Sequence, residues 1–283
     1  MAANVELHAP LTCLFWNAGR RDLDELVARL AADTAADVVV LAESGADQAK
    51  TLETLQRSVA PCFLAPTSDQ TRIQVFGHDD LNLREVYVDA SGRLTVRLLR
   101  YCGMEFLFAG AHLPSKIHWT REDQAAEVRE LSHQVREEEK RRGHARTILV
   151  GDLNMNPFED GVVQANGLHA MMTKAIAEQG SRTVQGRDYP FFYNPMWGFF
   201  GDRTPGPPGT FYYRHNGHLS YEWNILDQVL VRPEVLPFFD DVEIVTKIGE
   251  TELAAANGRP DGEVGSDHFP IVFRLAVPSN RES

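Results

Sequence analysis

The stretch with the clearest chemical potential is 148–157, which reads ILVGDLNMNP. Its aliphatic residues run directly into glycine, aspartate and asparagine, a pattern typical of a buried strand that ends abruptly. Asp152 and Asn154 lie two positions apart, so in an extended chain both side chains leave the same face. A carboxylate and a carboxamide at the end of a buried strand need partners. A metal ion, a water molecule or a phosphate oxygen would provide them.

Six further polar residues share this position at or near the end of an apolar run. They are Asn17, Glu43, His112, Asp227, Asp267 and His268. Each has an ordinary structural explanation when taken alone: Asn17 could cap a helix, and Asp267 could form an Asx-turn. Asp227 is different, because it lies in an apolar stretch where an unpaired carboxylate would shift its pKa or destabilise the fold. We expect His268 to be its partner.

The elements that would position these residues alternate at the start of the chain. Residues 11–16 and 37–42 read as buried strands, and 22–36 has apolar residues at helical spacing. A second helix is predicted around 49–59. The pattern then changes to short strands, which we interpret as an antiparallel meander with hairpin turns at Ser91-Gly92 and Cys102-Gly103. These strands are predicted at roughly 72–77, 84–89, 94–101 and 105–111.

The second half of the chain begins with a long predicted helix. Thr120 has the features of its N-cap, with Asp123 three residues on, and it should run to about Arg142. Another helix is predicted from about 161 to 179. Residues 189–223 hold nearly half of the aromatic side chains and a Thr-Pro-Gly-Pro-Pro-Gly run, too irregular for a helix and too aromatic for a solvated linker. The last strands are predicted at 225–231, 242–245 and 271–275.

Length and charge restrict the possibilities further. A chain of 283 residues could form one large domain or two small ones, and no linker rich in Pro, Gly or Ser divides it. We therefore expect a single domain comprising residues 1–283, with a core of about 11–275. The net charge of −12 argues against a protein that binds phosphate backbones by bulk electrostatics. It does not exclude a nuclease, because a divalent cation can supply positive charge locally.

The cysteines and the hydropathy pattern indicate the setting. Cys13, Cys62 and Cys102 are odd in number and widely spaced, which argues against a disulfide framework and against a cysteine-type zinc site. No apolar run approaches the ~20 residues needed to span a bilayer. We therefore expect a cytoplasmic protein without a membrane span.

The polar motifs together resemble the endonuclease/exonuclease/phosphatase superfamily. They are WNAG around Asn17, VLAES around Glu43, GAHLPS around His112, GDLNMNP, LDQVLV around Asp227 and GSDHFPI. This superfamily includes DNase I-like nucleases, AP endonucleases, deadenylases, inositol polyphosphate 5-phosphatases and bacterial sphingomyelinases. The resemblance spans about 11–273. It implies an α/β fold, a four-layer α/β/β/α sandwich of two mixed β-sheets flanked by helices.

The resemblance also implies a divalent metal site, and the residue types agree. Hydrolysis of a phosphate ester needs a positioned water, neutralisation of the phosphoryl oxygens and help for the leaving oxygen. Glu43 is the best candidate for a direct ligand, because a hard carboxylate oxygen suits Mg²⁺ or Mn²⁺. Asn17 and Asp267 would complete the metal site, directly or through bound waters.

The remaining residues are candidates for the catalytic steps. Asp152 would orient or deprotonate the attacking water, and Asn154 would hold that water or a phosphoryl oxygen. Asp227 would orient His268 and favour its imidazolium form beside the phosphate. His268 and His112 would then donate hydrogen bonds to non-bridging oxygens as negative charge builds.

Several functions remain open at this level. The first hypothesis is a metal-dependent phosphodiesterase, most simply a nuclease acting on nucleic acid or an oligonucleotide. The alternatives are a phosphomonoesterase or lipid phosphodiesterase, and a non-catalytic binding domain, which the complete polar set disfavours. The aromatic stretch 189–223 is either a base-stacking wall or a small accessory core or dimer contact. The sequence does not distinguish DNA from RNA or endo- from exonucleolytic cleavage.

Overall fold

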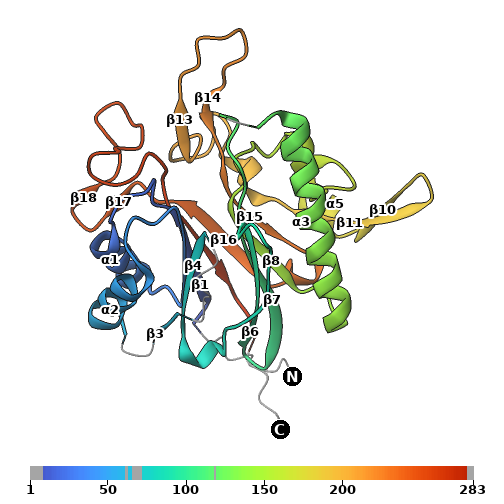
Figure 1. The fold of residues 1–283 in the computed structure, drawn as a ribbon, viewed down its shortest axis with the longest axis horizontal. Coiled ribbons are helices and arrows are strands. Elements are labelled where there is room, and N and C mark those ends of the chain that lie inside the picture. The colour runs from blue at the N-terminus through green and yellow to red at the C-terminus, as the bar shows by residue number, and fades with distance from the viewer. Residues whose placement is uncertain (1–8, 61–62, 66–71, 118, 279–283) are drawn as a thin grey trace, which may run out of the picture.

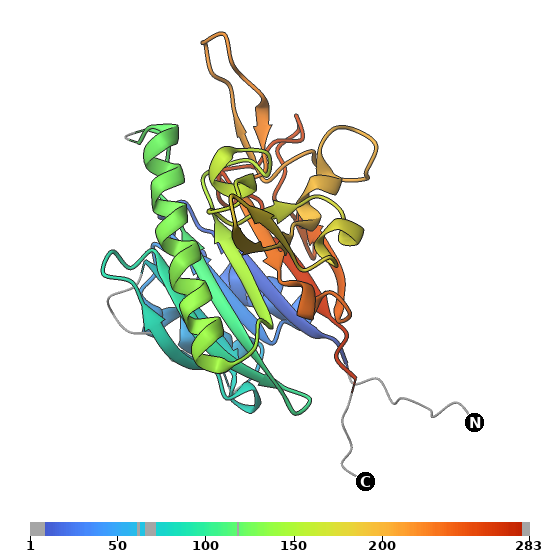
Figure 2. The same ribbon diagram turned by 90° about the vertical axis from the view of Figure 1, so that its right-hand side faces the viewer.

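Two β-sheets pack face to face in the computed structural model, which describes residues 9–60, 63–65, 72–117 and 119–278. Helices α1 (Asp24–Thr34) and α2 (Gln48–Ser58) lie on the outer side of one sheet, and α3 (Arg121–Arg142) covers the outer side of the other (Figure 1). Figure 2 shows α3 running along the second sheet. The arrangement is the predicted four-layer α/β/β/α sandwich, so the fold class is confirmed.

The first sheet joins strands from both ends of the chain. Its order is β16-β19-β1-β2-β4-β3. Strand β1 pairs parallel to β2 and antiparallel to β19, so the sheet is mixed. The strands are β1 (Leu11–Asn17), β2 (Val38–Ala42), β3 (Phe63–Leu64), β4 (Ile73–His78), β16 (Phe239–Ile244) and β19 (Ile271–Leu275).

The second sheet is built from the middle of the chain, in the order β5-β6-β7-β8-β15-β12-β9. Strand β7 pairs parallel to β8, whereas β8 and β15 are antiparallel, so this sheet is mixed too. The strands are β5 (Arg84–Val88), β6 (Leu94–Tyr101), β7 (Met104–His112), β8 (Thr147–Asp152), β9 (Ala170–Met171), β12 (Phe192–Tyr193) and β15 (Asp227–Val231).

The predicted meander is only partly right. Strands β5, β6 and β7 are consecutive antiparallel neighbours, with glycines at positive φ in both turns, Gly92 at 69° and Gly103 at 75°. Strand β4, however, pairs with β2 in the first sheet. The 3₁₀ turn η1 (Asp79–Leu81) follows β4, and there the chain passes from one sheet to the other.

The helix predicted at 161–179 is wrong. That segment forms two single-turn helices, α4 (Asp160–Val163) and α5 (Lys174–Ala177), with β9 between them. The chain turns back after α4, because Leu168 N–H donates to the Gly161 carbonyl at 3.1 Å. An ideal Cβ at Gly167 would lie 2.3 Å from the same carbonyl oxygen, so only glycine permits this approach.

Short hairpins and turns complete the fold. The β13–β14 hairpin projects from one end of the sandwich (Figures 1 and 2). The aromatic stretch 189–223 forms no α-helix, as the sequence predicted, and it contains several of these hairpin strands and turns. The pieces are β10 (Ser181–Val184), β11 (Arg187–Pro190), η2 (Pro195–Phe199), β13 (Phe211–Tyr213), β14 (Glu222–Asn224), η3 (Pro233–Val235), β17 (Lys247–Ile248) and β18 (Thr251–Glu252).

The boundaries of α3 agree with its sequence signals. The Thr120 hydroxyl accepts a hydrogen bond from Asp123 N–H at 3.1 Å, and the Asp123 carboxylate accepts one from Thr120 N–H at 3.2 Å. This capping box satisfies donors that the first turn of a helix leaves unpaired. Gly143, at a φ of 72°, ends the helix in the left-handed conformation that glycine adopts without strain.

Side-chain alternation explains how the layers pack. On β8, Ile148 and Val150 face the core between the sheets, whereas Leu149 faces the layer under α3. Val128 and Leu131 of α3 close that second layer. Because both faces of the strand are covered, it reads as a continuous apolar run rather than an alternating one.

The two sheets approach closely near the end of β7. Gly110 faces the first sheet, and a Cβ added there would lie 3.3 Å from Ile73 Cγ2 of β4 and 3.8 Å from Val40 Cγ1 of β2. Nearby, Arg72 N–H donates to the Gly92 carbonyl at 2.9 Å. This bond ties the beginning of β4 to the turn before β6, so the sheets are joined at this end.

Two of the three cysteines are described, and both are free thiols: Cys13 is buried and Cys102 is partly buried. Cys62 lies outside the described residues. Among the helices that the structure describes, none combines the length and the apolar character required to cross a bilayer.

Candidate active site

Strand register brings most of the predicted site residues to one end of the sandwich. Asn17 closes β1 opposite Ala42, which directly precedes Glu43. His112 closes β7 opposite Asp152, the last residue of β8. Asp227 opens the antiparallel strand β15, also directly opposite Asp152. The carboxyl ends of the parallel strands and the amino end of β15 therefore meet at one place.

Two contacts link the sheets across this place. Asn17 Nδ2 of the first sheet donates to Asp152 Oδ2 of the second at 2.8 Å. Glu43 Oε1, at the end of β2, lies 3.1 Å from His112 Nε2, at the end of β7. The site therefore lies at the junction between the two sheets, and each sheet contributes part of it.

Asp152 is a buried carboxylate surrounded by donors. Asn154 N–H donates to its Oδ1 at 2.8 Å, and Asn154 Nδ2 donates to Oδ2 at 3.0 Å. Asn154 holds this position with a φ of 50°, a left-handed conformation that asparagine tolerates better than most residues. Burial and the neighbouring Asp227 carboxylate raise the pKa of Asp152 to about 6. Its carboxylate is therefore easier to protonate than an ordinary one.

The expected pairing of Asp227 with His268 is present. His268 Nδ1 lies 2.8 Å from Asp227 Oδ2, and both side chains are almost fully buried. One ligand atom from each of Asp152, Asp227 and His268 lies within 4.8 Å of the others. Burial alone would lower the pKa of His268, but the charge and hydrogen bond of Asp227, together with the charge of Asp152, raise it to about 9. His268 is therefore a cation at neutral pH.

Glu43 is more accessible than Asp152, with 28% of its side chain exposed against 2%. It follows β2 with a φ of 47°, which turns the chain away from the strand. Arg20 Nε donates to Glu43 Oε2 at 3.0 Å. The hydrogen bond from His112 and the charges of His112 and Arg20 lower the pKa of Glu43 to about 2, despite the opposing effect of burial.

Among the described residues, Asp267 makes no direct hydrogen bond or ion pair with the other predicted metal ligands. It is exposed, and its Oδ1 accepts a hydrogen bond from Ser266 Oγ at 3.3 Å. A Cβ on Gly19 would lie 2.8 Å from the same oxygen, and Gly19 N–H donates to Asn17 Oδ1 at 3.0 Å. Gly19 therefore separates Asp267 from Asn17. Within the described ranges, no direct hydrogen bond joins Asp267 to Glu43 or Asn17.

The donor set suits a hard divalent cation. Glu43, Asn17 and Asp267 offer carboxylate and carboxamide oxygens, the ligands that Mg²⁺ and Mn²⁺ prefer. Two buried polar atoms of the same site, Asp227 Oδ1 and His112 Nδ1, have no hydrogen-bond partner among the residues that the structure describes. Unpaired buried polar atoms are unfavourable unless a ligand or water completes them.

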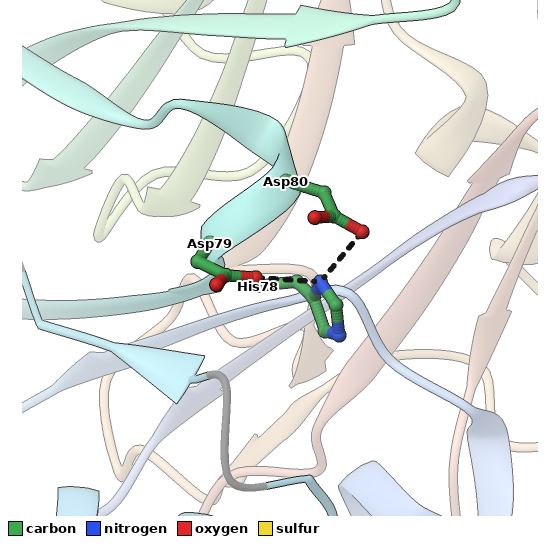
Figure 3. A group of neighbouring side chains, drawn as sticks. All are labelled: His78, Asp79 and Asp80. Carbon is green, nitrogen blue, oxygen red and sulfur yellow. Dashed lines mark ion pairs between the residues drawn. The ribbon is translucent and has the colours of Figure 1, made fainter.

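A second group with possible metal ligands lies elsewhere. His78 Nδ1 is 3.4 Å from both Asp79 Oδ1 and Asp80 Oδ2 (Figure 3). This group lies at the opposite end of β4 from Ile73, which pairs with Ala42 beside Glu43. Both aspartates are exposed. Exposed carboxylates beside an imidazole are ordinary surface structure, so we assign the group no part in the site.

The sequence model of one protein family matches residues 12–268, described as the endonuclease/exonuclease/phosphatase family. The chain belongs to this family. It is therefore a phosphoric ester hydrolase of the kind that depends on a divalent metal, which agrees with the donor set above. No curated protein matches the chain in sequence.

Solved structures with the same fold include proteins from D. rerio and Leptotrichia buccalis. Humanized D. rerio TDP2 with 14 mutations is 16% identical, over 95% of this chain and 99% of that one, with a TM-score of 0.58. D. rerio TDP2 complexed with single strand DNA product is 16% identical, over 95% and 100%, with a TM-score of 0.57. A family protein from Leptotrichia buccalis is 15% identical, over 94% and 100%, with a TM-score of 0.58. At these identities the likeness shows the fold.

Two neighbours of the site were not singled out from the sequence. Phe211 of β13 packs on His268 with ring centroids 4.6 Å apart. Arg20, which contacts Glu43, is one of two adjacent arginines. The aromatic composition of 189–223 indicated that region but not which ring would reach the site. Nothing in the sequence distinguishes Arg20 from Arg21.

Proposed function

We propose that the chain is a Mg²⁺- or Mn²⁺-dependent nuclease that hydrolyses phosphodiester bonds in single-stranded nucleic acid or oligonucleotides. The observation that carries this proposal is the buried group of Asp152, Asp227 and His268 beside the Glu43–His112 pair. These residues combine a carboxylate of raised pKa, an imidazolium and an accessible carboxylate at one junction. Phosphodiester hydrolysis requires such a combination of base, cation and metal ligand.

In this proposal Glu43, Asn17 and Asp267 hold the cation, which when bound supplies a Lewis acid for a phosphoryl oxygen. Arg20 pairs with Glu43, and its side chain is 86% exposed, so it can leave that carboxylate without loss of packing.

Asp152 acts on the attacking water. A carboxylate with a pKa of about 6 is mostly ionised at neutral pH and still basic enough to accept a proton. The hydrogen bonds from Asn17 and Asn154 fix its orientation. Asn154 also donates to the Leu113 carbonyl at 2.9 Å, so its amide is held in place beside that carboxylate.

His268 and His112 stabilise the phosphoryl oxygens as negative charge builds. His268 stays protonated through neutral pH because Asp227 holds its Nδ1 side, which leaves the Nε2 side for the substrate. Removing one such donor typically lowers turnover by about 10²- to 10³-fold.

The aromatic rings beside His268 support an unpaired strand as substrate. Phe211 packs on His268, and the ring of Tyr213 is nearly parallel to that of Phe211, at a centroid distance of 6.5 Å and an angle of 15°. Tyr213 is 56% exposed. Exposed aromatic faces in a row offer stacking surfaces for bases, which a paired duplex does not present. The D. rerio TDP2 structure with a single strand DNA product agrees with this substrate class.

The test is hydrolysis of a substrate panel by the purified protein, with and without divalent metal. The panel contains bis-(p-nitrophenyl) phosphate, single-stranded DNA, RNA, duplex DNA, inositol phosphates and sphingomyelin. We expect cleavage of bis-(p-nitrophenyl) phosphate and single strands with Mg²⁺ or Mn²⁺, and none in EDTA. Asp152→Ala should lower turnover at least ~10²-fold while the circular dichroism spectrum stays that of a folded protein.

Full activity in EDTA would contradict the metal role. Cleavage of inositol phosphates or sphingomyelin alone would replace the nuclease by a phosphomonoesterase or a lipid phosphodiesterase. Binding of these substrates without any turnover would favour a non-catalytic domain.

A further inference from the structure

Two arginines lie next to the Glu43–His112 pair in the strand register. Arg72 directly precedes β4, whose first residue Ile73 pairs with Ala42 beside Glu43. Arg93 directly precedes β6, and its carbonyl accepts a hydrogen bond from His112 N–H at 2.8 Å. The register of two different sheets therefore places one arginine next to each member of the pair.

Backbone and side-chain contacts hold these arginines near each other. Arg72 N–H donates to the Gly92 carbonyl at 2.9 Å, and Arg72 Nε donates to the Ser91 carbonyl at 3.2 Å. The Arg93 guanidinium lies over the ring of Trp119, with Cζ 5.8 Å from the ring centroid. Such a cation–π contact restricts where the guanidinium can go while leaving its N–H donors available.

The charges of the two arginines are not neutralised by direct ion pairs. In the part of the chain that the structure describes, no carboxylate forms an ion pair with Arg72 or Arg93. Burial and the positive charge of Arg72 lower the pKa of Arg93, while Glu127 and Asp89 act in the opposite direction more weakly. Guanidinium groups close enough to influence each other, without a carboxylate bound to either, are suited to bind a phosphate through charge-assisted hydrogen bonds. In a chain of net charge −12 this is an uncommon place for positive charge to gather.

We propose that Arg72, Arg93 and Trp119 form a subsite for a second phosphate of the substrate, next to the one that is cleaved. The subsite would bind the phosphate of the neighbouring nucleotide through the two guanidinium groups, with Trp119 positioning Arg93. This inference rests on the proposed nuclease function and adds to it a requirement: the preferred substrate has at least two consecutive phosphodiesters. Arg72 and Arg93 are binding residues here and take no part in bond cleavage.

The test compares substrates that differ by one phosphate. A dinucleotide with a single phosphodiester cannot reach the subsite, whereas a trinucleotide can. We expect Arg72→Ala and Arg93→Ala each to raise KM for the trinucleotide and longer strands about tenfold, as loss of a charged hydrogen bond does, with kcat little changed. Their kcat/KM for the dinucleotide and for bis-(p-nitrophenyl) phosphate should equal that of the wild type. The slope of log affinity against log salt should fall by about 0.7 for single strands.

Two further variants distinguish binding from general charge and from folding. Arg187→Ala removes the same charge from an exposed position on β11 and should leave KM and the salt slope unchanged. Arg93→Lys keeps the charge, so the salt slope should stay that of the wild type. Its KM should lie between those of the wild type and Arg93→Ala. The backbone hydrogen bond from His112 N–H to the Arg93 carbonyl is kept in all these variants.

The outcomes separate the two proposals. If the wild type cleaves strands but Arg72→Ala and Arg93→Ala match Arg187→Ala, the subsite is wrong and the nuclease stands. An equal loss on the dinucleotide and on bis-(p-nitrophenyl) phosphate would also overturn the subsite, because it would indicate damage to the catalytic group. If the wild type hydrolyses bis-(p-nitrophenyl) phosphate and no nucleic acid, both proposals fail.

Discussion

The charge on His268 depends on a carboxylate that comes from the other sheet. Asp227 opens β15 of the second sheet, and His268 lies just before β19 of the first. The 2.8 Å contact between them is therefore a side-chain link between the sheets as well as part of the proposed catalytic site. The strength of the Asp227–His268 contact should be measurable from the titration of the His268 imidazole.

We predict that His268 titrates near pH 9 in the metal-free protein, and that Asp227→Asn lowers this pKa. The folded pKa is raised above the ordinary value of 6.5, so the pair stabilises the fold fully below pH 6.5 and loses that effect as pH rises through 9. Imidazole proton NMR in EDTA measures the pKa, and urea unfolding of both proteins gives the stability difference. A wild-type pKa near 6.5, or a stability difference that grows above pH 9, would contradict this account.

At this scale the sequence predicted much of the site. Five of the eight predicted residues lie at or directly next to strand ends, and Asn154, Asp267 and His268 lie two to four residues from one. Polar residues after buried strands need partners, and strand ends meet at one edge. Asp227 and His268 could be paired in advance, since a buried carboxylate in an apolar strand requires a counter-charge. Phe211 and Arg20 could not be chosen, because their contacts depend on irregular loops with no periodic signal. The roles of the eight residues stay predictions until the variants are measured.

Among the elements, α3 is fastened to the second sheet by a buried ion pair. Arg232, at the end of β15, donates from Nε to Glu139 Oε1 at 2.7 Å and from Nη2 to Oε2 at 3.2 Å. Its Nη1 donates to the carbonyls of Pro190 and Phe191 at 3.1 and 3.0 Å. One guanidinium therefore joins the helix, the strand and the start of the aromatic stretch.

We predict that Glu139→Gln lowers the free energy of unfolding by about 3–5 kcal/mol, because it leaves Arg232 buried without a counter-charge. The matched control is Glu25→Gln, which removes an exposed partner of Arg57 and should change stability by about 0–1 kcal/mol. Urea denaturation followed by circular dichroism compares them. Equal effects of the two substitutions would show that the buried pair contributes no more than a surface one.

Element boundaries were predictable where local signals agreed with packing. The α3 capping box and its C-terminal glycine are such signals, and both are present in the structure. The helix predicted at 161–179 is wrong because its apolar residues belong to two single-turn helices and a strand. The chain turns back at Gly167, and this turn depends on a tertiary contact. The prediction that β4 belongs to the meander was wrong for a similar reason, since the strand period alone does not say which sheet a strand joins.

On the scale of the whole molecule, the two sheets share one core. The inward faces of β1, β2, β4 and β19 pack against those of β7, β8 and β15 in a single cluster of buried side chains. This continuity supports the prediction of one domain. The single domain and the cytoplasmic location both stay predictions.

The approach of the sheets at Gly110 has a consequence for how the enzyme can be inactivated from a distance. The Asn17–Asp152 and Glu43–His112 contacts both span the junction, so their lengths follow the spacing of the two layers. A methyl group at position 110 would lie 3.2 Å from Thr95 Cγ2 of its own sheet and 3.3 Å from Ile73 Cγ2 of the other sheet. It would press on Ile73 and shift the two layers against each other, without altering any reacting group. Misplacement of catalytic groups by about 1 Å can lower turnover about 10²-fold.

We therefore expect Gly110→Ala to remain folded, with a circular dichroism spectrum like that of the wild type, and to show a markedly lower kcat on bis-(p-nitrophenyl) phosphate. Wild-type kcat in this variant would show that the junction tolerates wider spacing. Loss of turnover would mean that a change in the apolar interior, at a residue that contacts no charged group, can inactivate this enzyme through the spacing of its sheets.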